Sequence, residues 1–448
     1  MKIGLVAYAF PPFPASGAAR AENVARALQA AGHDVFVVTS RLPGERKNHR
    51  VEEPGLRVRA VRIWPNPRHL LVRAKQFLAS TGWATTRTPP RSQRTPVAAA
   101  GSAPNWKRLV LSMLWLPDDL QGFVPPAVLT LLRRKRKLDR IYTTSPPHSA
   151  HLAGAALKLL TGLPWIAEYR DPWLGSQVSV KPAACRTMLS DRLEERLERL
   201  CLRHADLLVA VSEGIHKLLL EKVGPRRANE VILVRNGIEH ISTDPTPRAG
   251  AAPPFRIVHL GSLYMQRDPK GFLTALSALR RELHLGTGDV ELDLVGEGRE
   301  FRGVSVVAMA AELGIEDWLR VRGWIPHAQT DDVLRGADLL LLLAQGQPLQ
   351  VPNKLYEYLG SGRPIFALAD EEGETARMLR QVGGHYLVTR DEPDAIAAAL
   401  HDAFAGGGAH LRPDFAVLET WRTDRQMTEL VKAISLQPRH RQPGREVP

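Results

Sequence analysis

Short apolar runs alternate with amphipathic segments through most of the 448 residues. The chain opens with an apolar run at 2–9, an amphipathic segment at 18–30 and a second apolar run at 34–40, which predict strand, helix and strand. Comparable pairs continue to about residue 234, and a second series starts at residue 255. Repeated strand–helix units favour parallel sheets covered by helices, so the pattern predicts an α/β protein.

Residues 242–254 separate the two series and are rich in proline, threonine and alanine, as expected of a linker. We therefore predict two doubly wound, Rossmann-like domains facing across a cleft, at 1–241 and 255–410. A last amphipathic helix is predicted at 411–435, and residues 436–448 are expected to be disordered.

The excess of positive charge lies in one part of the chain. Residues 61–140 contain fifteen Lys and Arg against three acidic residues, which accounts for nearly all of the net charge of +13. Within it, 64–126 is rich in proline and is predicted to be a basic, partly flexible excursion of the first domain. Two pieces, 70–78 and 106–116, combine apolar and basic residues, which is typical of helices on an anionic lipid surface. The alternative is that their apolar faces pack inside the domain.

A basic run ends the helix predicted at 127–137 and consists of Arg133, Arg134, Lys135, Arg136 and Lys137. Basic side chains near a helix C-terminus complement its dipole, but five in a row exceed that need. We predict that this run contacts an acceptor or an anionic membrane surface. The charge comes without a zinc pattern, an RNP-like strand or a helix-turn-helix signal, so nucleic acid is not expected as a partner.

The sequence also indicates a compartment. The longest apolar run falls short of the ~20 residues of a membrane span. Residues 1–8 are apolar but lack a small-residue cleavage site, so we interpret them as a strand rather than a signal peptide. Cys185 and Cys201 are too far apart for a CxxC pair, which argues against a zinc site or a disulfide framework. We expect a cytoplasmic protein without a metal.

The most informative stretch follows the apolar run 339–343, which has the composition of a strand buried on both faces. Pro352 suits the first position of the next helix, and Lys354 and Glu357 then share one face of it. A helix N-terminus after a parallel strand binds anions, and Lys354 adds positive charge there. Glu357 could accept hydrogen bonds from the paired hydroxyls of a ribose. The alternative is an ordinary surface Lys–Glu pair.

The first half offers a second candidate site. Gly17 stands between a predicted strand and helix, where the backbone could approach a ligand closely. Arg170 and Asp171 follow the strand predicted at 163–169, and the carboxyl ends of such strands are where open α/β sheets place their chemistry. His148 is a further candidate, with a role at the start of a helix as the alternative.

Taken in order, these motifs resemble those of the family-4 retaining glycosyltransferases of GT-B fold over nearly the full length of the chain. The resemblance rests on Gly17 with the Gly-His-Asp-Val at 32–35, Arg-Asp-Pro-Trp at 170–173, Val-Ser at 211–212, Asn-Gly-Ile at 236–238, Leu-Gly-Ser-Leu at 260–263, Lys-Gly at 270–271, Leu-Val-Gly-Glu-Gly at 294–298, the segment 354–357 and Gly-Arg-Pro at 362–364.

The resemblance implies a hexosyl-transferring enzyme of the bacterial cell envelope. The second domain would bind a nucleotide-diphosphate sugar, and the first would bind a lipid-linked or cell-surface glycan acceptor. The sugar would be transferred with retention of configuration by a protein held peripherally on the inner face of the plasma membrane, as in polysaccharide biosynthesis. No cofactor is implied beyond the sugar nucleotide as co-substrate. The helix at 411–435 would cross back onto the first domain.

The resemblance also assigns residues. Donor-binding positions are Gly17, Gly261, Ser262, Arg267, Lys270, Gly296, Asn353, Lys354 and Glu357, and catalytic positions are Arg170, Asp171 and Lys270. Cations are needed there because negative charge builds on the leaving phosphate as the sugar–phosphate bond breaks.

Two positions depart from the family pattern. Ser262 replaces the family's arginine, so we expect Arg267 to supply that charge. Leu349, with Gln347 beside it, replaces the glutamate that pairs with Glu357 in the family. A non-catalytic GT-B protein that binds a glycan or a partner is therefore the alternative function, and nucleic-acid binding through the basic segment is a third.

Overall fold

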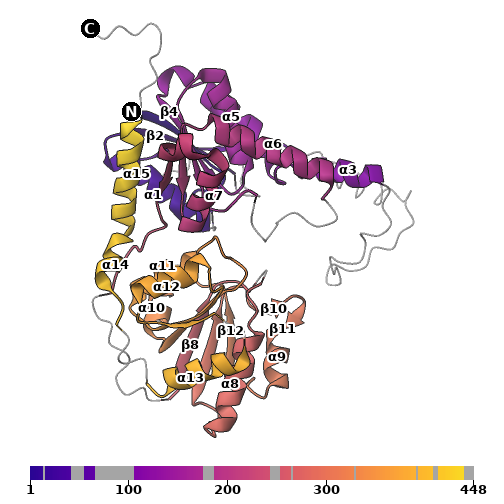
Figure 1. Ribbon diagram of the computed structural model, residues 1–448, viewed down its shortest axis with the longest axis vertical. Helices are drawn as coiled ribbons and strands as arrows, with labels where there is room; N and C mark the ends of the chain where they lie inside the picture. Colours follow the sequence, from indigo (N-terminus) through magenta and orange to yellow (C-terminus); the bar gives the residue numbers. More distant parts are fainter. Residues whose placement is uncertain are drawn as a thin grey trace. The chain divides into compact units, whose positions relative to one another are not determined.

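The computed structural model describes ten stretches of the chain, which are 1–13, 16–41, 55–65, 105–174, 186–242, 253–263, 266–326, 329–389, 392–406 and 412–437. They form two compact α/β units (Figure 1). The first consists of Met1–Val211, Ile215–Val234 and Met427–Pro448, and the second of Ser212–Gly214 and Arg235–Gln426. Among the described residues, none of the helices combines the length and the hydropathy needed to cross a bilayer.

The first unit is built on a parallel sheet of seven strands in the order β3-β2-β1-β4-β5-β6-β7. Its strands are β1 (Lys2–Ala7), β2 (Asp34–Ser40), β3 (Arg57–Val61), β4 (Arg140–Ser145), β5 (Trp165–Tyr169), β6 (Leu207–Ala210) and β7 (Val231–Leu233). Its helices are α1 (Ser16–Ala30), α3 (Asn105–Met113), η2 (Gln121–Phe123), α4 (Val124–Leu132), η3 (Lys135–Lys137), α5 (Ser149–Thr161), α6 (Met188–His204), α7 (Glu213–Val223) and η5 (Pro225–Glu230).

The second unit has a parallel sheet of six strands in the order β12-β9-β8-β13-β14-β15. These are β8 (Phe255–Leu260), β9 (Val290–Val295), β12 (Leu319–Gly323), β13 (Leu339–Ala344), β14 (Ile365–Ala369) and β15 (Tyr386–Val388), and a small hairpin adds β10 (Glu300–Phe301) and β11 (Val304–Ser305). Its helices are α8 (Lys270–Glu282), α9 (Val306–Glu312), α10 (Thr330–Arg335), α11 (Asn353–Ser361), α12 (Glu374–Val382), α13 (Pro393–Phe404) and α14 (Phe415–Thr420), and α15 (Thr423–Leu436) follows.

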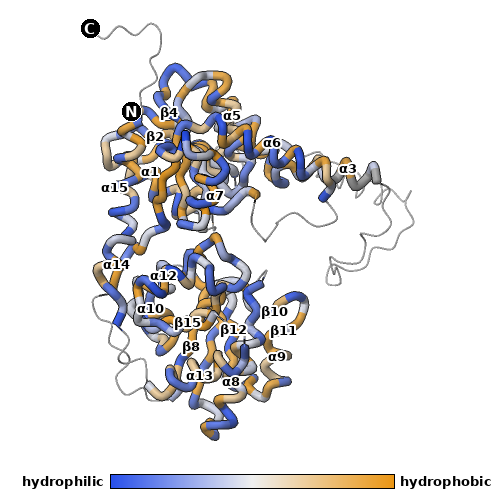
Figure 2. The backbone as a smooth tube through the Cα atoms, viewed as in Figure 1, coloured by the Kyte–Doolittle hydropathy of each residue, from blue (hydrophilic) through white to orange (hydrophobic). Residues whose placement is uncertain are grey.

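Hydrophobic strands form the centre of each unit, with helices on both faces of the sheets (Figure 2). All six residues of β13 are buried, as expected of a central parallel strand covered on both faces. The two doubly wound α/β arrays of the sequence-based prediction are therefore confirmed. In each sheet the strand order reverses between two neighbouring strands, β1 and β4 in the first unit and β8 and β13 in the second. Ligands bind outside the carboxyl ends of the strands at such a switch point.

Some element boundaries differ from the sequence-based expectations. The single helix predicted at 411–435 is two helices, because the chain between α14 and α15 forms a bridge from Arg422 to Ile238. Of α15, Met427, Leu430 and Ile434 lie in the core of the first unit. The N-terminal part of the first unit ends at Val234, before the predicted boundary at 241.

The basic excursion, the linker and the C-terminal tail predicted from the sequence are only partly described by the structure. Within the excursion predicted at 64–126, residues from 105 onward form α3, η2 and the start of α4, whereas 66–104 lie outside the described residues. Most of the linker predicted at 242–254 and most of the tail predicted at 436–448 also lie outside them.

Candidate functional site

Gly17 and Arg170 meet at the carboxyl edge of the first sheet. Arg170 directly follows β5, and its guanidinium donates hydrogen bonds to the carbonyl oxygens of Ser145 (Nε, 3.1 Å) and Pro146 (Nη2, 2.6 Å) at the end of β4. Gly17 lies in the first turn of α1, and a Cβ added there would overlap Nη1 of Arg170. The absence of a side chain at Gly17 thus lets the first turn of α1 approach a fixed cation, an arrangement suited to an anion.

A buried ion pair fixes α1 against the sheet beneath this site. Arg20 in α1 contacts Glu168 in β5, with 2.8 Å between Nη2 and Oε1, and also donates to the carbonyl oxygen of Val234. Thr144 donates to the other oxygen of Glu168. Burial alone would raise the pKa of the Glu168 carboxyl, but Arg20 and Thr144 outweigh it and hold that pKa below its usual value. The first turn of α1 is therefore held in place by a charged anchor.

His148 and Trp173 line the same edge as a stacked pair, with ring centroids 5.1 Å apart and planes 7° from parallel. Burial, with smaller effects of Arg170 and Lys222, lowers the pKa of His148 to about 3. The imidazole is therefore neutral at physiological pH. It can donate or accept a hydrogen bond but does not act as an acid. His148 also occupies the N-cap position of α5, but its side chain makes no capping hydrogen bond.

Asp171 follows Arg170 and is half-buried. Burial lowers the pKa of the Arg170 guanidinium, and the neighbouring carboxylates of Glu168 and Asp171 oppose that effect. The structure thus places Gly17 and Arg170 in contact, with Asp171 next to Arg170 in the chain. The stacking of Trp173 on His148 was not predicted from the sequence.

In the second unit, two glycines end adjacent strands at the switch point. Gly261 follows β8 and donates its N–H to Val295 (2.8 Å) at the end of β9. Gly296 follows β9 with φ of 120°, and a Cβ there would lie 2.5 Å from the carbonyl oxygen of Gly261. Both positions require glycine, and both leave the strand ends free of side chains. Ser262, next in the chain, is half-buried.

The loops after β8 and β13 contact each other beside these glycines. Arg267 lies with Nη2 at 3.4 Å from Oε1 of Gln347, and the Gln345 amide donates to the carbonyl oxygen of Asp268 (3.1 Å). Arg267 thus lies in the loop after β8, against the loop after β13, and its role as a replacement for the cation lost at Ser262 stays a prediction.

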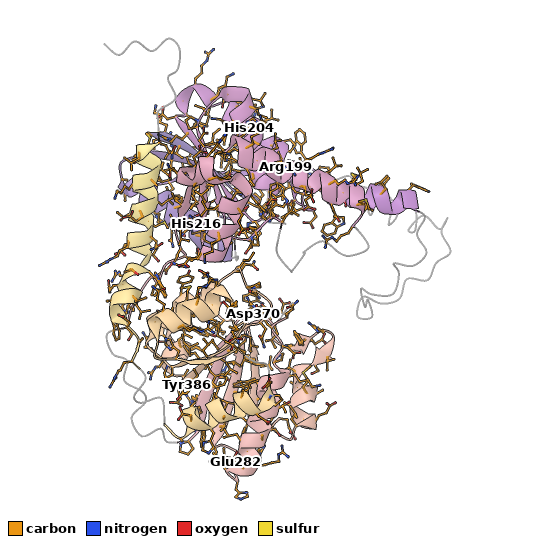
Figure 3. The ribbon with its side chains drawn as sticks, in the orientation of Figure 1. Arg199, His204, His216, Glu282, Asp370 and Tyr386 are labelled. Carbon is orange, nitrogen blue, oxygen red and sulfur yellow. The ribbon has the colours of Figure 1, made fainter. Side chains whose placement is uncertain are left out.

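Asp370, at the end of β14, supports the same loop. It accepts a 2.8 Å hydrogen bond from the N–H of Gly346. Figure 3 shows Asp370 at the opposite end of this unit from Glu282, the last residue of α8. Asp370 was missed in the sequence, although an acidic residue directly after an apolar run signals such a position.

Helix α11 supplies the remaining predicted donor residues. Nζ of Lys354 lies 2.7 Å from Oε2 of Glu357, and the amide of Asn353 lies 3.4 Å from the other oxygen of Glu357. The side chains of Lys354 and Glu357 are 31% and 24% exposed, so both remain accessible to a ligand. Pro352 is the N-cap of α11 rather than its first residue, and Gly362 ends the helix with φ of 71°.

Tyr358 ties α11 to the switch point. Its hydroxyl accepts a 2.7 Å hydrogen bond from the N–H of Leu260 in β8 and lies 3.4 Å from the carbonyl oxygen of Leu341 in β13. Because Tyr358 is buried next to Glu357, the helix N-terminus and its Lys–Glu pair are held at the carboxyl edge. Lys270 reaches this edge from the first residue of α8, where it is exposed and its N–H is capped by Asp268.

The basic run lies elsewhere in the first unit. Arg133 to Lys137 follow α4 and precede β4, so they lie at the amino edge of the sheet, opposite the edge with Gly17 and Arg170. All five residues are exposed, and Arg134 covers the ring of Phe36 at 4.1 Å. The described part of the chain contains no group of three or more His, Cys, Asp or Glu arranged to hold a metal ion.

The fold of this chain matches solved structures that include glycosyltransferases of GT-B fold. The chain superposes on Anabaena HepE in complex with UDP-glucose with a TM-score of 0.61, covering 97% of this chain and 99% of that one at 13% identity. It superposes on the lipopolysaccharide outer core galactosyltransferase WaaB with a TM-score of 0.57, covering 97% and 99% at 15% identity. The fold is therefore GT-B.

Comparisons of the sequence also point to glycosyltransferases. Residues 17–237 match the glycosyl transferase 4-like domain, and 254–405 match the glycosyl transferases group 1 domain. The probable glycosyltransferase WbjE of Pseudomonas aeruginosa is 23% identical over 304 residues, which cover 64% of this chain and 71% of WbjE. The two domains of the chain thus match two glycosyltransferase families, and together these matches cover most of the chain, as its motifs predicted.

A first prediction concerns Gly17. Gly17→Ala should displace the Arg170 guanidinium and lower kcat/KM by about tenfold or more, because positioning rather than folding is lost. The melting temperature should change little, since the overlap involves the end of a long side chain. The double variant Gly17→Ala with Arg170→Ala has no guanidinium to displace. Its kcat/KM should therefore be little lower than that of Arg170→Ala alone. Additive losses would show that the two residues act independently.

Proposed function

We propose that this protein is a retaining glycosyltransferase that moves a sugar from a nucleotide-diphosphate sugar to a lipid-linked or cell-surface glycan acceptor. Its second unit would bind the donor and its first unit the acceptor. The reaction would take place at the inner face of a bacterial plasma membrane. The relatives support the substrate class: HepE was solved with UDP-glucose, and WaaB acts on the lipopolysaccharide outer core.

The observation that carries the proposal is the Lys354–Glu357 pair at the start of α11, held at the switch point by Tyr358. The N–H groups of the first turn and Lys354 suit a diphosphate, and Glu357 suits the hydroxyls of a ribose.

The remaining positive charge comes from Arg267 and Lys270, which lie at the same edge. Negative charge grows on the leaving diphosphate as the bond to the sugar breaks, and preorganised cations and N–H donors stabilise it. This chain's own cations would meet that need, so the proposal calls for no metal and no further cofactor.

A panel of nucleotide sugars tests the proposal by ligand-induced thermal shift. One or a few donors should raise the melting temperature, because a ligand at 100 times its Kd stabilises the folded state by about 2.7 kcal/mol. The corresponding free sugars serve as controls and should not shift it. If none of the nucleotide sugars raises the melting temperature, the proposed donor site is wrong.

A non-catalytic GT-B protein is the second candidate, and the residues at 262 and 349 favour it. Ser262 has no charge to offer a phosphate, and Leu349 cannot accept hydrogen bonds from sugar hydroxyls through its side chain. Donor hydrolysis separates the two functions. A transferase should release free sugar slowly from the donor identified by thermal shift, whereas a binding protein would bind that donor without turnover.

A further inference from the structure

Two glutamines after β13, Gln345 and Gln347, are each held by the loop after β8. The amide nitrogen of Gln345 donates to the carbonyl oxygen of Asp268 (3.1 Å), and Oε1 of Gln347 lies 3.4 Å from Nη2 of Arg267. These partners fix the orientation of both amides, because a carbonyl oxygen only accepts hydrogen bonds and a guanidinium only donates them. The other atom of each amide is therefore an acceptor, Oε1, in Gln345 and a donor, Nε2, in Gln347.

Asp370 adds a carboxylate from the adjacent strand. It follows β14, which pairs with β13, and its Oδ1 accepts the N–H of Gly346, the residue between the two glutamines (2.8 Å). Neighbouring strands lie about 4.8 Å apart, so the three side chains are within reach of one small ligand. Figure 3 labels Asp370 at this end of the second unit.

The remaining polar atom of each of these three side chains is buried. Among the residues that the structure describes, none pairs with Oε1 of Gln345, Nε2 of Gln347 or Oδ2 of Asp370. Gln347 as a whole is only 7% exposed. Buried polar groups in folded proteins are nearly always hydrogen-bonded, so three such atoms at one edge of the sheet call for a common partner.

The chemistry of the three atoms selects the class of ligand. Two of them are acceptors, and one of these belongs to a carboxylate. An ionised diphosphate has no hydrogen to donate to them, and Asp370 would repel its charge. A hydroxyl group both donates and accepts, so neighbouring sugar hydroxyls can pair with Gln345, Gln347 and Asp370 together. The carboxylate of a uronic acid would meet Asp370 with like charge.

The same three residues compensate for the departure at position 349. The side chain of Leu349 has no acceptor for a sugar hydroxyl, and Gln347 stands two residues earlier in the same loop. We propose that Gln345, Gln347 and Asp370 bind the hydroxyl groups of the transferred sugar, and that this sugar is neutral rather than a uronic acid. This inference rests on the proposed function, because it assigns the sugar half of the proposed donor to these residues.

The test separates binding of the sugar from binding of the nucleotide. Calorimetry of the full chain uses three pairs of probes, which are UDP-glucose with UDP, GDP-mannose with GDP and dTDP-glucose with dTDP. Asp370→Asn keeps an oxygen for the N–H of Gly346 but replaces the acceptor Oδ2 by an NH₂ donor. For the pair that binds the wild type, this variant should bind the nucleotide sugar about 10- to 100-fold more weakly and the nucleoside diphosphate equally well.

Asp338→Asn is the matched control. Asp338 directly precedes β13, at the amino edge of the same sheet, and accepts the backbone N–H of Arg256 at 2.8 Å, as Asp370 accepts that of Gly346. This variant should bind both members of the pair like the wild type.

Analogues of the donor give a readout that a merely structural role of Asp370 would not change. Fluorine cannot donate a hydrogen bond, so one of the monodeoxyfluoro sugars should bind the wild type more weakly and lose nothing further in Asp370→Asn. The uronic acid of the same donor should bind the wild type more weakly than the neutral sugar does, and Asp370→Asn should narrow that difference.

Four outcomes would overturn the inference and leave the proposed function standing. Equal losses for the nucleotide sugar and the nucleoside diphosphate would mean that Asp370 only supports the loop at Gly346. An unchanged affinity for the nucleotide sugar would mean that water alone pairs with Oδ2. Additive losses with every fluorinated analogue, or a uronic acid bound as tightly as the neutral sugar, would also contradict it. If none of the three pairs binds the wild type, the proposed donor site fails and this inference fails with it.

Discussion

Replacing Glu357 with Gln is expected to weaken binding of the nucleotide sugar about 10- to 100-fold and to leave the fold intact. A hydrogen bond to a charged acceptor is worth roughly 1.5–3 kcal/mol, which corresponds to that range of affinity. Folding should be little affected, because a partly exposed Lys–Glu pair contributes only about 0–1 kcal/mol. Isothermal titration calorimetry measures the affinity, and thermal melting without ligand checks the fold.

The control for Glu357→Gln is another pair of the same spacing in the same unit. Arg335 and Asp332 are three residues apart in α10, as Lys354 and Glu357 are in α11, but both side chains are largely exposed. Asp332→Asn should therefore leave nucleotide affinity unchanged. Equal affinities for Glu357→Gln and the wild type would make the α11 pair an ordinary surface ion pair, which is the alternative that its sequence left open.

Much of the candidate site follows from chain order alone. In a doubly wound sheet every strand ends at the same edge, so residues directly after apolar runs lie there, as Arg170 does in the first unit and Gly261 in the second. The length and leucine content of 339–343 predicted a buried strand, and the helix with the Lys–Glu pair was predicted to follow it. The sheet order itself is consistent with the fold implied by the ordered motifs.

What the sequence missed depends on contacts between distant residues. The hydrogen bond from Gly346 to Asp370 and the stacking of Trp173 on His148 join separate loops, and no local pattern encodes them. The sequence also left open whether the apolar residues of α3 are buried or exposed, because an apolar helix face has the same spacing in both cases. The break between α14 and α15 arises from the bridge to Ile238, which interrupts an otherwise continuous amphipathic pattern.

Arg267→Ala and Lys270→Ala are each expected to lower kcat/KM for the nucleotide sugar by about 10²–10³-fold, because a cation beside the leaving diphosphate matters most in the transition state. Affinity for the free nucleoside, which lacks phosphates, should be unchanged. Arg267 also contacts Gln347, so Arg267→Lys, which keeps the charge, should retain more activity than Arg267→Ala.

The matched control is Arg281→Ala, which removes a cation from the last turn of the helix that Lys270 begins. Arg281 neighbours Glu282, at the end of the unit opposite Asp370 (Figure 3), so its loss should not affect turnover. Steady-state kinetics on the identified donor and calorimetry with the nucleoside give the two readouts. If the variants lose affinity for the nucleoside as much as they lose kcat/KM for the nucleotide sugar, Arg267 and Lys270 support the fold of their loop. The diphosphate would then be bound by Lys354 and the N–H groups of α11 alone.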